Sequence, residues 1–146
     1  MRQIQIYENA DILCEELAEA LPIPASISEP IYIALSGGST PTLFFEKMTA
    51  IDDPDAFMNI HFYWVDERHV PEDDPESNYA VFRRLLVDTG IISAENVHPI
   101  KYHPDIDQMT ANYEQELRKH LPFEDGYPLF DEIVLGVGED GHTASI

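Results

Sequence analysis

Four short apolar runs, separated by stretches of helical periodicity, constrain the fold of this chain more than any other feature. A short apolar run predicts a buried strand, and the stretches between the runs place apolar side chains on one face of a helix. Strands and helices that alternate in this way form a mostly parallel sheet flanked by helices. We therefore expect a single α/β domain over residues 1–146. The expected strands are residues 31–35, 60–65, 97–100 and 133–135.

Three loops of unusual composition directly follow three of these strands. Residues 36–41 are Ser-Gly-Gly-Ser-Thr-Pro, residues 66–69 are Asp-Glu-Arg-His, and residues 136–142 are Gly-Val-Gly-Glu-Asp-Gly-His. Parallel strands end at the same edge of a sheet, and open α/β sheets bind their ligands at that edge. The three loops are therefore expected to line one cleft.

The first loop has the composition of an anion site, with small side chains, hydroxyl groups and two glycines. Thr40 is expected to cap the following helix, with Pro41 as its first residue. The N–H groups and the dipole at a helix N-terminus attract anions. An ordinary strand-to-helix turn is the alternative, and the Gly-Lys-Ser/Thr of a Walker A loop is missing. The expected phosphate-binding residues are Ser36, Gly37, Gly38, Ser39 and Thr40.

The last loop presents an acid and an imidazole, Asp140 and His142, two residues apart. In one interpretation the two side chains only cap and solubilise a glycine-rich turn. A second is the G-x-G-x-x-G fingerprint of dinucleotide-binding folds, but its acidic ribose partner about twenty residues later is missing. The third is catalytic, because a histidine moves protons near neutral pH when a carboxylate orients its ring. The loop alone leaves these alternatives open.

The middle loop places a positive charge in a very acidic chain. The sequence has 28 acidic and 8 basic side chains and a net charge of −20. Arg68, at the end of a strand and beside Asp66, is therefore a candidate ligand for an anionic substrate. A surface set of ion pairs is the alternative. Nucleic acid and membranes are not expected as partners, since both bind basic patches.

The remaining composition predicts a cytoplasmic protein without a metal. Cys14 is the single cysteine, so a disulfide within the chain is impossible and a reducing compartment is expected. We expect neither a secretory signal nor a membrane span, because no long apolar segment is present. Four histidines lack the spacing of metal ligands. These are His69, His98, His103 and His120.

Taken together, the three loops resemble one protein family in order and spacing. The matching segments are residues 36–41, 66–68, 70–71, 77–79 and 136–145. They are similar to motifs of the glucosamine-6-phosphate isomerase/6-phosphogluconolactonase family, and the resemblance extends from about residue 31 to residue 146. Arg68 and Thr143-Ala144-Ser145 favour the lactonases of this family. Its deaminases typically have Tyr after Asp-Glu and Ile-Gly-Phe-Asn-Glu after Gly-His.

The resemblance implies a Rossmann-like fold and hydrolysis of 6-phosphoglucono-1,5-lactone in the pentose phosphate pathway, without a cofactor. In this hypothesis His142 accepts a proton from the attacking water, and Asp140 orients the imidazole. Arg68 faces the developing oxyanion or the sugar hydroxyls, and Asp66 orders Arg68 or binds hydroxyls. Residues 36–40 hold the phosphate of the small-molecule substrate. The alternatives are a glucosamine-6-phosphate deaminase or isomerase, and a non-catalytic sugar-phosphate-binding protein.

Family members continue beyond the position of Ile146 and supply a later basic residue for the phosphate. We therefore expect these 146 residues to be the N-terminal part of a longer chain, truncated at the C-terminus. Thr143 is expected to cap a helix that starts at Ala144, although so short a helix cannot sustain itself. Alone, the chain is expected to expose an apolar sheet edge, to self-associate through it and to be nearly inactive.

Smaller local features are also predicted. Residues 4–7 alternate between apolar and polar and are expected to form an edge strand. Ser77 is expected to cap a helix that Gly90 closes. Residues 123–128 are expected to be a loop that leads into the last strand.

Overall fold

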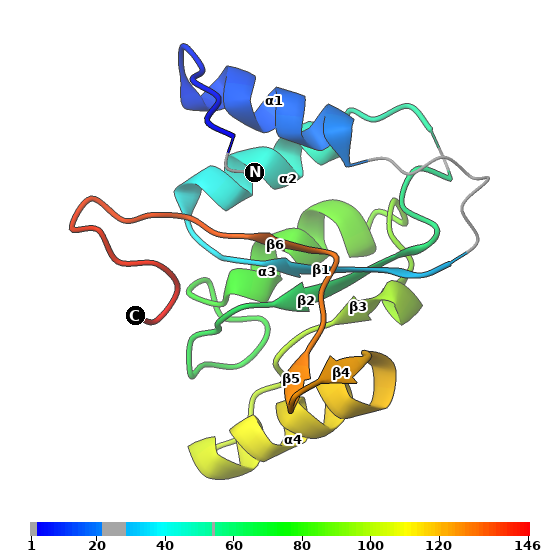
Figure 1. The fold of residues 1–146 in the computed structure, drawn as a ribbon, viewed down its shortest axis with the longest axis vertical. Helices are drawn as coiled ribbons and strands as arrows, with labels where there is room; N and C mark the ends of the chain where they lie inside the picture. The colour runs from blue at the N-terminus through cyan, green and yellow to red at the C-terminus, as the bar shows by residue number, and fades with distance from the viewer. Residues whose placement is uncertain (1–2, 22–28, 54) are drawn as a thin grey trace.

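A four-stranded parallel sheet lies at the centre of the structure, a computed structural model that describes residues 3–21, 29–53 and 55–146. The strand order is β3-β2-β1-β6, and Figure 1 shows the sheet between two layers of helices. The expected α/β fold is therefore confirmed. The strands are β1 (Ile31–Leu35), β2 (Ile60–Trp64), β3 (Val97–His98) and β6 (Glu132–Val134).

The larger core lies on one face of the sheet, between the strands and three helices. Phe82 is its centre: its ring lies 5.1 to 5.2 Å from the rings of Phe45, Phe62 and Trp64. All four side chains are buried, so aromatic packing fixes these helices on the sheet. The elements are α1 (Ala10–Ala20), α2 (Ser39–Met48), α3 (Asn78–Phe82) and a π-helical turn (Arg83–Val87).

A smaller layer covers the other face. Its core is Ala34, Tyr63 and Leu121, with Tyr32 and Phe130 packed against them. No helix in the described part of the chain is long and apolar enough to cross a membrane. The elements of this layer are α4 (Ile106–His120) and a hairpin of β4 (Phe123–Glu124) and β5 (Tyr127–Pro128); a 3-10 turn (Ala94–Asn96) precedes β3.

Helix α4 completes the hydrogen bonding of β2 where β3 is too short to do so. The register pairs β3 only with Phe62 and Tyr63 of β2. The next residue, Trp64, donates its N–H to the hydroxyl of Tyr113 at 2.9 Å, and that hydroxyl donates to the carbonyl of Trp64 at 2.9 Å. A side chain thus replaces the missing strand partner, since buried backbone groups need one.

The opposite edge of the sheet, strand β6, is exposed. Ile133 in β6 is 54% exposed, and Leu135 and Val137, which follow the strand, are 49% and 74% exposed. The expected exposed apolar edge is therefore present in the 146-residue chain.

Several local predictions were wrong. Residues 4–7 form no strand, and Ile4 and Ile6 are exposed, so they lack a neighbour to pair with. Residues 123–128 form the β4–β5 hairpin, because Asp125 and Gly126 adopt the positive φ that a tight hairpin turn requires. Ser77 does cap a helix, but from Arg83 onward it widens to a π-turn that the bond from Asp88 N–H to the Arg83 carbonyl closes.

Candidate active site

The three unusual loops lie side by side at the carboxyl edge of the sheet, as predicted. Two backbone hydrogen bonds join the strand ends: Ser36 N–H donates to the Val134 carbonyl at 3.1 Å, and Val65 N–H to the Leu35 carbonyl at 2.9 Å. Between the loops lies an open cleft of about 380 Å³. All the predicted site residues except Asp140 line it: Ser36, Gly37, Gly38, Ser39, Thr40, Asp66, Arg68 and His142.

One wall of the cleft is the loop that enters helix α2. The helix begins at Ser39, and its N-cap is Gly38, with φ 113° and no side-chain cap. The prediction that Thr40 caps the helix was therefore wrong: Gly38 supplies a backbone conformation that other residues rarely adopt. The first-turn N–H groups of a helix have no acceptor within it. The first residues of α2, Ser39 and Thr40, line the cleft, so the positive end of the helix dipole lies at this wall.

A second wall is the loop after β2, which one carboxylate holds in place. Glu67 accepts hydrogen bonds from the N–H groups of Arg68 (2.7 Å), Asn78 (2.6 Å) and Tyr79 (3.0 Å), and from the hydroxyl of Ser77 (2.9 Å). These bonds tie the loop to the start of α3. Reasoning from the sequence gave Glu67 no role, because its partners lie ten to twelve residues further on and no spacing rule brings them together.

Asn78 is a further cleft residue, and the motif that contains it does not indicate its role from the sequence alone. Its amide donates to the carbonyl of Asp66 at 3.1 Å and lies 3.5 Å from that residue's carboxylate. It also packs against Gly37, where an added Cβ would overlap the Asn78 side chain. Gly37 is therefore required for the close approach of the first two loops, apart from any contact with a ligand.

Asp66 and Arg68 do not pair with one another. Asp66 accepts instead from the hydroxyl of Ser145 at 3.3 Å, which brings the last loop against the middle one (Figure 1). Arg68 is exposed, and no carboxylate of the described residues forms an ion pair with it. Of the two expected roles of Asp66, ordering Arg68 is therefore not supported, and Arg68 is available to an anion.

The third wall carries the acid and the imidazole. Asp140 accepts hydrogen bonds from Nδ1 of His142 and from its backbone N–H, the latter at 3.3 Å. The side-chain bond from His142 is the main cause that lowers the pKa of Asp140. An ionised carboxylate only accepts hydrogen bonds, so Nδ1 of His142 carries the proton of this bond, and the bond does not use Nε2.

The glycines of this turn hold the imidazole in place. An added Cβ at Gly138 would overlap the ring of His142, so the ring packs directly on the glycine backbone. The N–H of Gly138 donates to the carbonyl of His142 at 2.8 Å, and Gly141 turns the chain with φ 89°. The expected helix at Ala144 is not formed: that residue has φ 51°, outside the helical range.

Comparisons with known proteins identify the family of the chain. The family of glucosamine-6-phosphate isomerases/6-phosphogluconolactonase matches residues 7–146, and the chain belongs to that family. It is 40% identical over 142 residues to the 6-phosphogluconolactonase of Haemophilus influenzae, covering 96% of this chain and 60% of that protein. It is 41% identical over 150 residues to the 6-phosphogluconolactonase of a Synechocystis species, covering 99% of this chain and 62% of that protein.

A solved structure of the same family also resembles the fold of this chain. The 6-phosphogluconolactonase of Trypanosoma brucei superposes with a TM-score of 0.84 at 29% identity, covering all of this chain and 63% of that one. The chain thus spans about 60% of the length of the relatives it matches.

Proposed function

We propose that this chain hydrolyses 6-phospho-D-glucono-1,5-lactone to 6-phospho-D-gluconate, the reaction that names its relatives. One observation carries the proposal: the Asp140–His142 pair and the N-terminus of helix α2 line the same cleft or border it. A proton acceptor and an anion site placed in this way fit a substrate that has a reactive ester at one end and a phosphate at the other.

The imidazole acts as a general base. Nε2 of His142 takes a proton from the water molecule that attacks C1 of the lactone, while Asp140 holds the Nδ1 proton and stabilises the charged ring. The tetrahedral intermediate then breaks its bond between C1 and the ring oxygen. His142 returns the proton to that oxygen, so the enzyme ends the cycle unchanged.

The phosphate positions the reacting carbon. Residues 36–40 supply hydroxyl groups and the N–H groups at the start of α2 to the phosphate, while Arg68 supplies positive charge to the cleft as a whole. Binding energy gained at the phosphate holds C1 against the base. Arg68 also reaches the developing oxyanion or the sugar hydroxyls, and the carboxylate of Asp66 accepts from a hydroxyl.

The associations of the chain follow from its surface. A net charge of −20 disfavours nucleic acid, and a single buried cysteine suits a reducing cytoplasm. The exposed apolar side chains of β6 and of the residues that follow it, Ile133, Leu135 and Val137, provide a surface through which 146-residue chains self-associate. Sedimentation at rising protein concentration tests this, and a monomer at all concentrations would contradict it.

The activity is tested on the 146-residue chain and on the product of the complete reading frame that encodes it. The hydrolysis rate is measured by 13C NMR at constant pH, with spontaneous hydrolysis subtracted. We expect the product of the complete reading frame to hydrolyse 6-phosphogluconolactone, and to act much more slowly on gluconolactone without the phosphate. The 146-residue chain alone is expected to be nearly inactive. Binding without turnover by both proteins, or release of ammonia from glucosamine 6-phosphate, would reject the proposal.

A further inference from the structure

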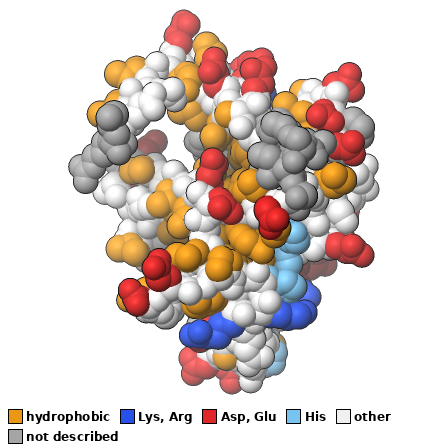
Figure 2. Space-filling view, turned by 45° about the vertical axis from the view of Figure 1, so that its right-hand side comes forward, with side chains coloured by type: hydrophobic (Ala, Val, Ile, Leu, Met, Phe, Trp, Pro, Cys, Tyr) orange, Lys and Arg blue, Asp and Glu red, His pale blue; other side chains and the backbone are white. Residues whose placement is uncertain are grey.

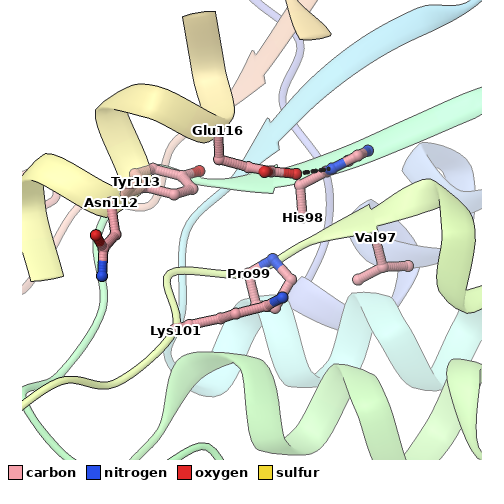
Figure 3. Close-up of a pocket in the computed structure, with 7 residues that line it drawn as sticks. All are labelled: Val97, His98, Pro99, Lys101, Asn112, Tyr113 and Glu116. Atoms are coloured by element: carbon pink, nitrogen blue, oxygen red, sulfur yellow. Dashed lines mark hydrogen bonds and ion pairs between the residues drawn. The ribbon is translucent and has the colours of Figure 1, made fainter. Parts of the chain in front are cut away.

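A second cluster of titratable groups lies outside the cleft, between the sheet and helix α4. It consists of His61 on β2, His98 on β3, and Glu116 and His120 on α4, and we refer to it as the histidine cluster. None of its members lines the catalytic cleft. Figure 3 shows two of them, His98 and Glu116, which point toward one another from a strand and a helix. The proposed hydrolysis uses none of these side chains.

Strand and helix geometry bring the cluster together. Glu116 and His120 are four residues apart, so they lie on the same face of α4. His98 is paired in register with Tyr63, and its ring stacks on the ring of Tyr63 at 4.5 Å and 8°. His98 is only 6% exposed. Its position is therefore fixed before any ligand binds.

The distances between the nitrogen and oxygen atoms match those of a metal-binding set. Nδ1 of His98 lies 2.8 Å from Oε1 of Glu116, and Nε2 of His120 lies 3.2 Å from the same oxygen. One ligand atom from each residue lies within 4.8 Å of the other two. With metal–nitrogen bonds of about 2.0–2.1 Å, tetrahedral ligands stand roughly 3.3 Å apart. The two distances to Glu116 are slightly shorter than this value, so a small widening of the three groups would make room for one ion.

The surroundings supply the other requirements of such a site. Nε2 of His98 is hydrogen-bonded to Nδ1 of His61 at 3.1 Å, as the free nitrogen of a metal-bound histidine usually is. A pocket of about 290 Å³, lined by His98 and Glu116, gives access to a fourth ligand from solvent.

Basic residues also lie near the cluster. The last turn of α4 carries Arg118 and Lys119, and Lys101 lines the pocket. On the face seen in Figure 2, histidine side chains lie beside Lys and Arg side chains. The coordinating carboxylate of Glu116 offsets this positive charge. A hard cation that prefers several oxygen ligands is disfavoured, and a zinc-like ion with nitrogen ligands is favoured.

We propose that His98, Glu116 and His120 bind one Zn²⁺ ion, which joins helix α4 to strand β3. The spacing of the histidines predicted no metal site, because that prediction considered histidines alone and did not include Glu116 as a ligand. The site is independent of the proposed hydrolysis, and its function is to stabilise the layer whose own core is small.

The test is a calorimetric titration of the chain with ZnCl₂. All the proteins carry His142→Asn, because the Asp140–His142 pair is a competing site. We expect one Zn²⁺ per chain with micromolar or tighter affinity, and an affinity at least tenfold weaker after His120→Gln or Glu116→Gln. His69→Gln removes an exposed histidine elsewhere and is the matched control, with unchanged affinity.

Two outcomes would overturn the proposal: no binding below millimolar Zn²⁺, or equal affinity in the control and in both cluster variants. If a variant fails to fold, NMR of the imidazole nitrogens in the His142→Asn protein decides. Zinc must shift the ring resonances of His98 and His120 and leave that of His69 in place.

Discussion

Two pairs of a histidine and a carboxylate, Asp140–His142 and His98–Glu116, have the same side-chain chemistry but different surroundings. Asp140 and His142 belong to one turn, and their side chains are 76% and 58% exposed. His98 and Glu116 come from a strand and a helix, and their side chains are 6% and 37% exposed. The first pair is open to solvent beside an anion site, whereas the second joins two elements of the fold.

The environment therefore decides what each pair does. A hydrogen bond from His142 lowers the pKa of Asp140, whereas burial lowers the pKa of His98. In the exposed pair one ring nitrogen stays accessible to a water molecule. In the buried pair both ring nitrogens of His98 are already hydrogen-bonded, to His61 and Glu116. Only the exposed pair is suited to proton transfer with a substrate.

The most severe test of this comparison is His142→Asn. Removal of a general base typically costs about 10²–10⁴-fold in rate, so we expect a loss of that size in lactone hydrolysis at constant pH. His69→Gln, which removes an exposed histidine outside both pairs, should leave the rate within about twofold. Equal rates for the two variants would remove His142 from the mechanism.

Gly138→Ala tests whether the position of the imidazole matters as much as its presence. The new Cβ overlaps the His142 ring and must displace it. Because a displacement of about 1 Å can cost roughly 10²-fold, we expect kcat to fall by that order while the fold is kept. Gly136→Ala is the matched control: it adds a Cβ with nothing within 4 Å, and its loss should be far smaller. Similar losses in both variants would show that glycine flexibility, and not ring placement, is what counts.

The sequence was sufficient for the strands of the parallel sheet and for most of the loops that line the cleft. Apolar runs located β1, β2 and β6, and glycines with polar neighbours marked the loops after them. The contacts of Glu67 and Asn78 could not be predicted, because they join loops that meet only in the folded chain. The same holds for the histidine cluster. Its helical part has a visible four-residue spacing, but the strand histidine lies 18 residues before Glu116.

Short elements were the hardest to predict. The β4–β5 hairpin has two residues in each strand, too few for an alternating pattern, although Asp125-Gly126 is a strong turn signal. At the other extreme, Thr143 has the chemistry of a helix cap but no helix follows it. A capping residue predicts a helix only where the residues after it are numerous enough to pack and to offset the free-energy cost of helix nucleation.

Glu67→Gln tests how the cleft loops are held. The carboxylate accepts from three N–H groups and one hydroxyl, and bonds to a charged acceptor contribute about 1.5–3 kcal/mol each in favourable cases. A neutral amide has one acceptor oxygen in place of two, so some of these N–H and O–H donors lose their acceptor. We therefore expect the free energy of unfolding in urea to fall by roughly 1–3 kcal/mol. The exposed Glu76→Gln is the control, with a change within about 0.5 kcal/mol. A neutral result at Glu67 would mean that packing, and not this carboxylate, holds the loop.

Tyr113→Phe sharpens the comparison from the side of the buried pair. The hydroxyl is the partner of both backbone groups of Trp64, at 2.9 Å each, and Tyr113 lies on the same helix as Glu116. Without it, a buried N–H and carbonyl at the end of β2 lose their acceptor and donor, which costs about 1–2 kcal/mol in the free energy of unfolding. Tyr127→Phe, at a side chain that is 73% exposed, is the control and should change stability by less than about 0.5 kcal/mol.

Trp64 ends the strand that leads to Asp66 and Arg68, but the three parallel strands β1, β2 and β3 and the bonds to Glu67 also hold that loop. The stability of Tyr113→Phe should therefore fall while kcat stays within a few-fold of wild type. A large loss of kcat with unchanged stability would mean that α4 controls the cleft directly, and that the two sides of the sheet are not independent.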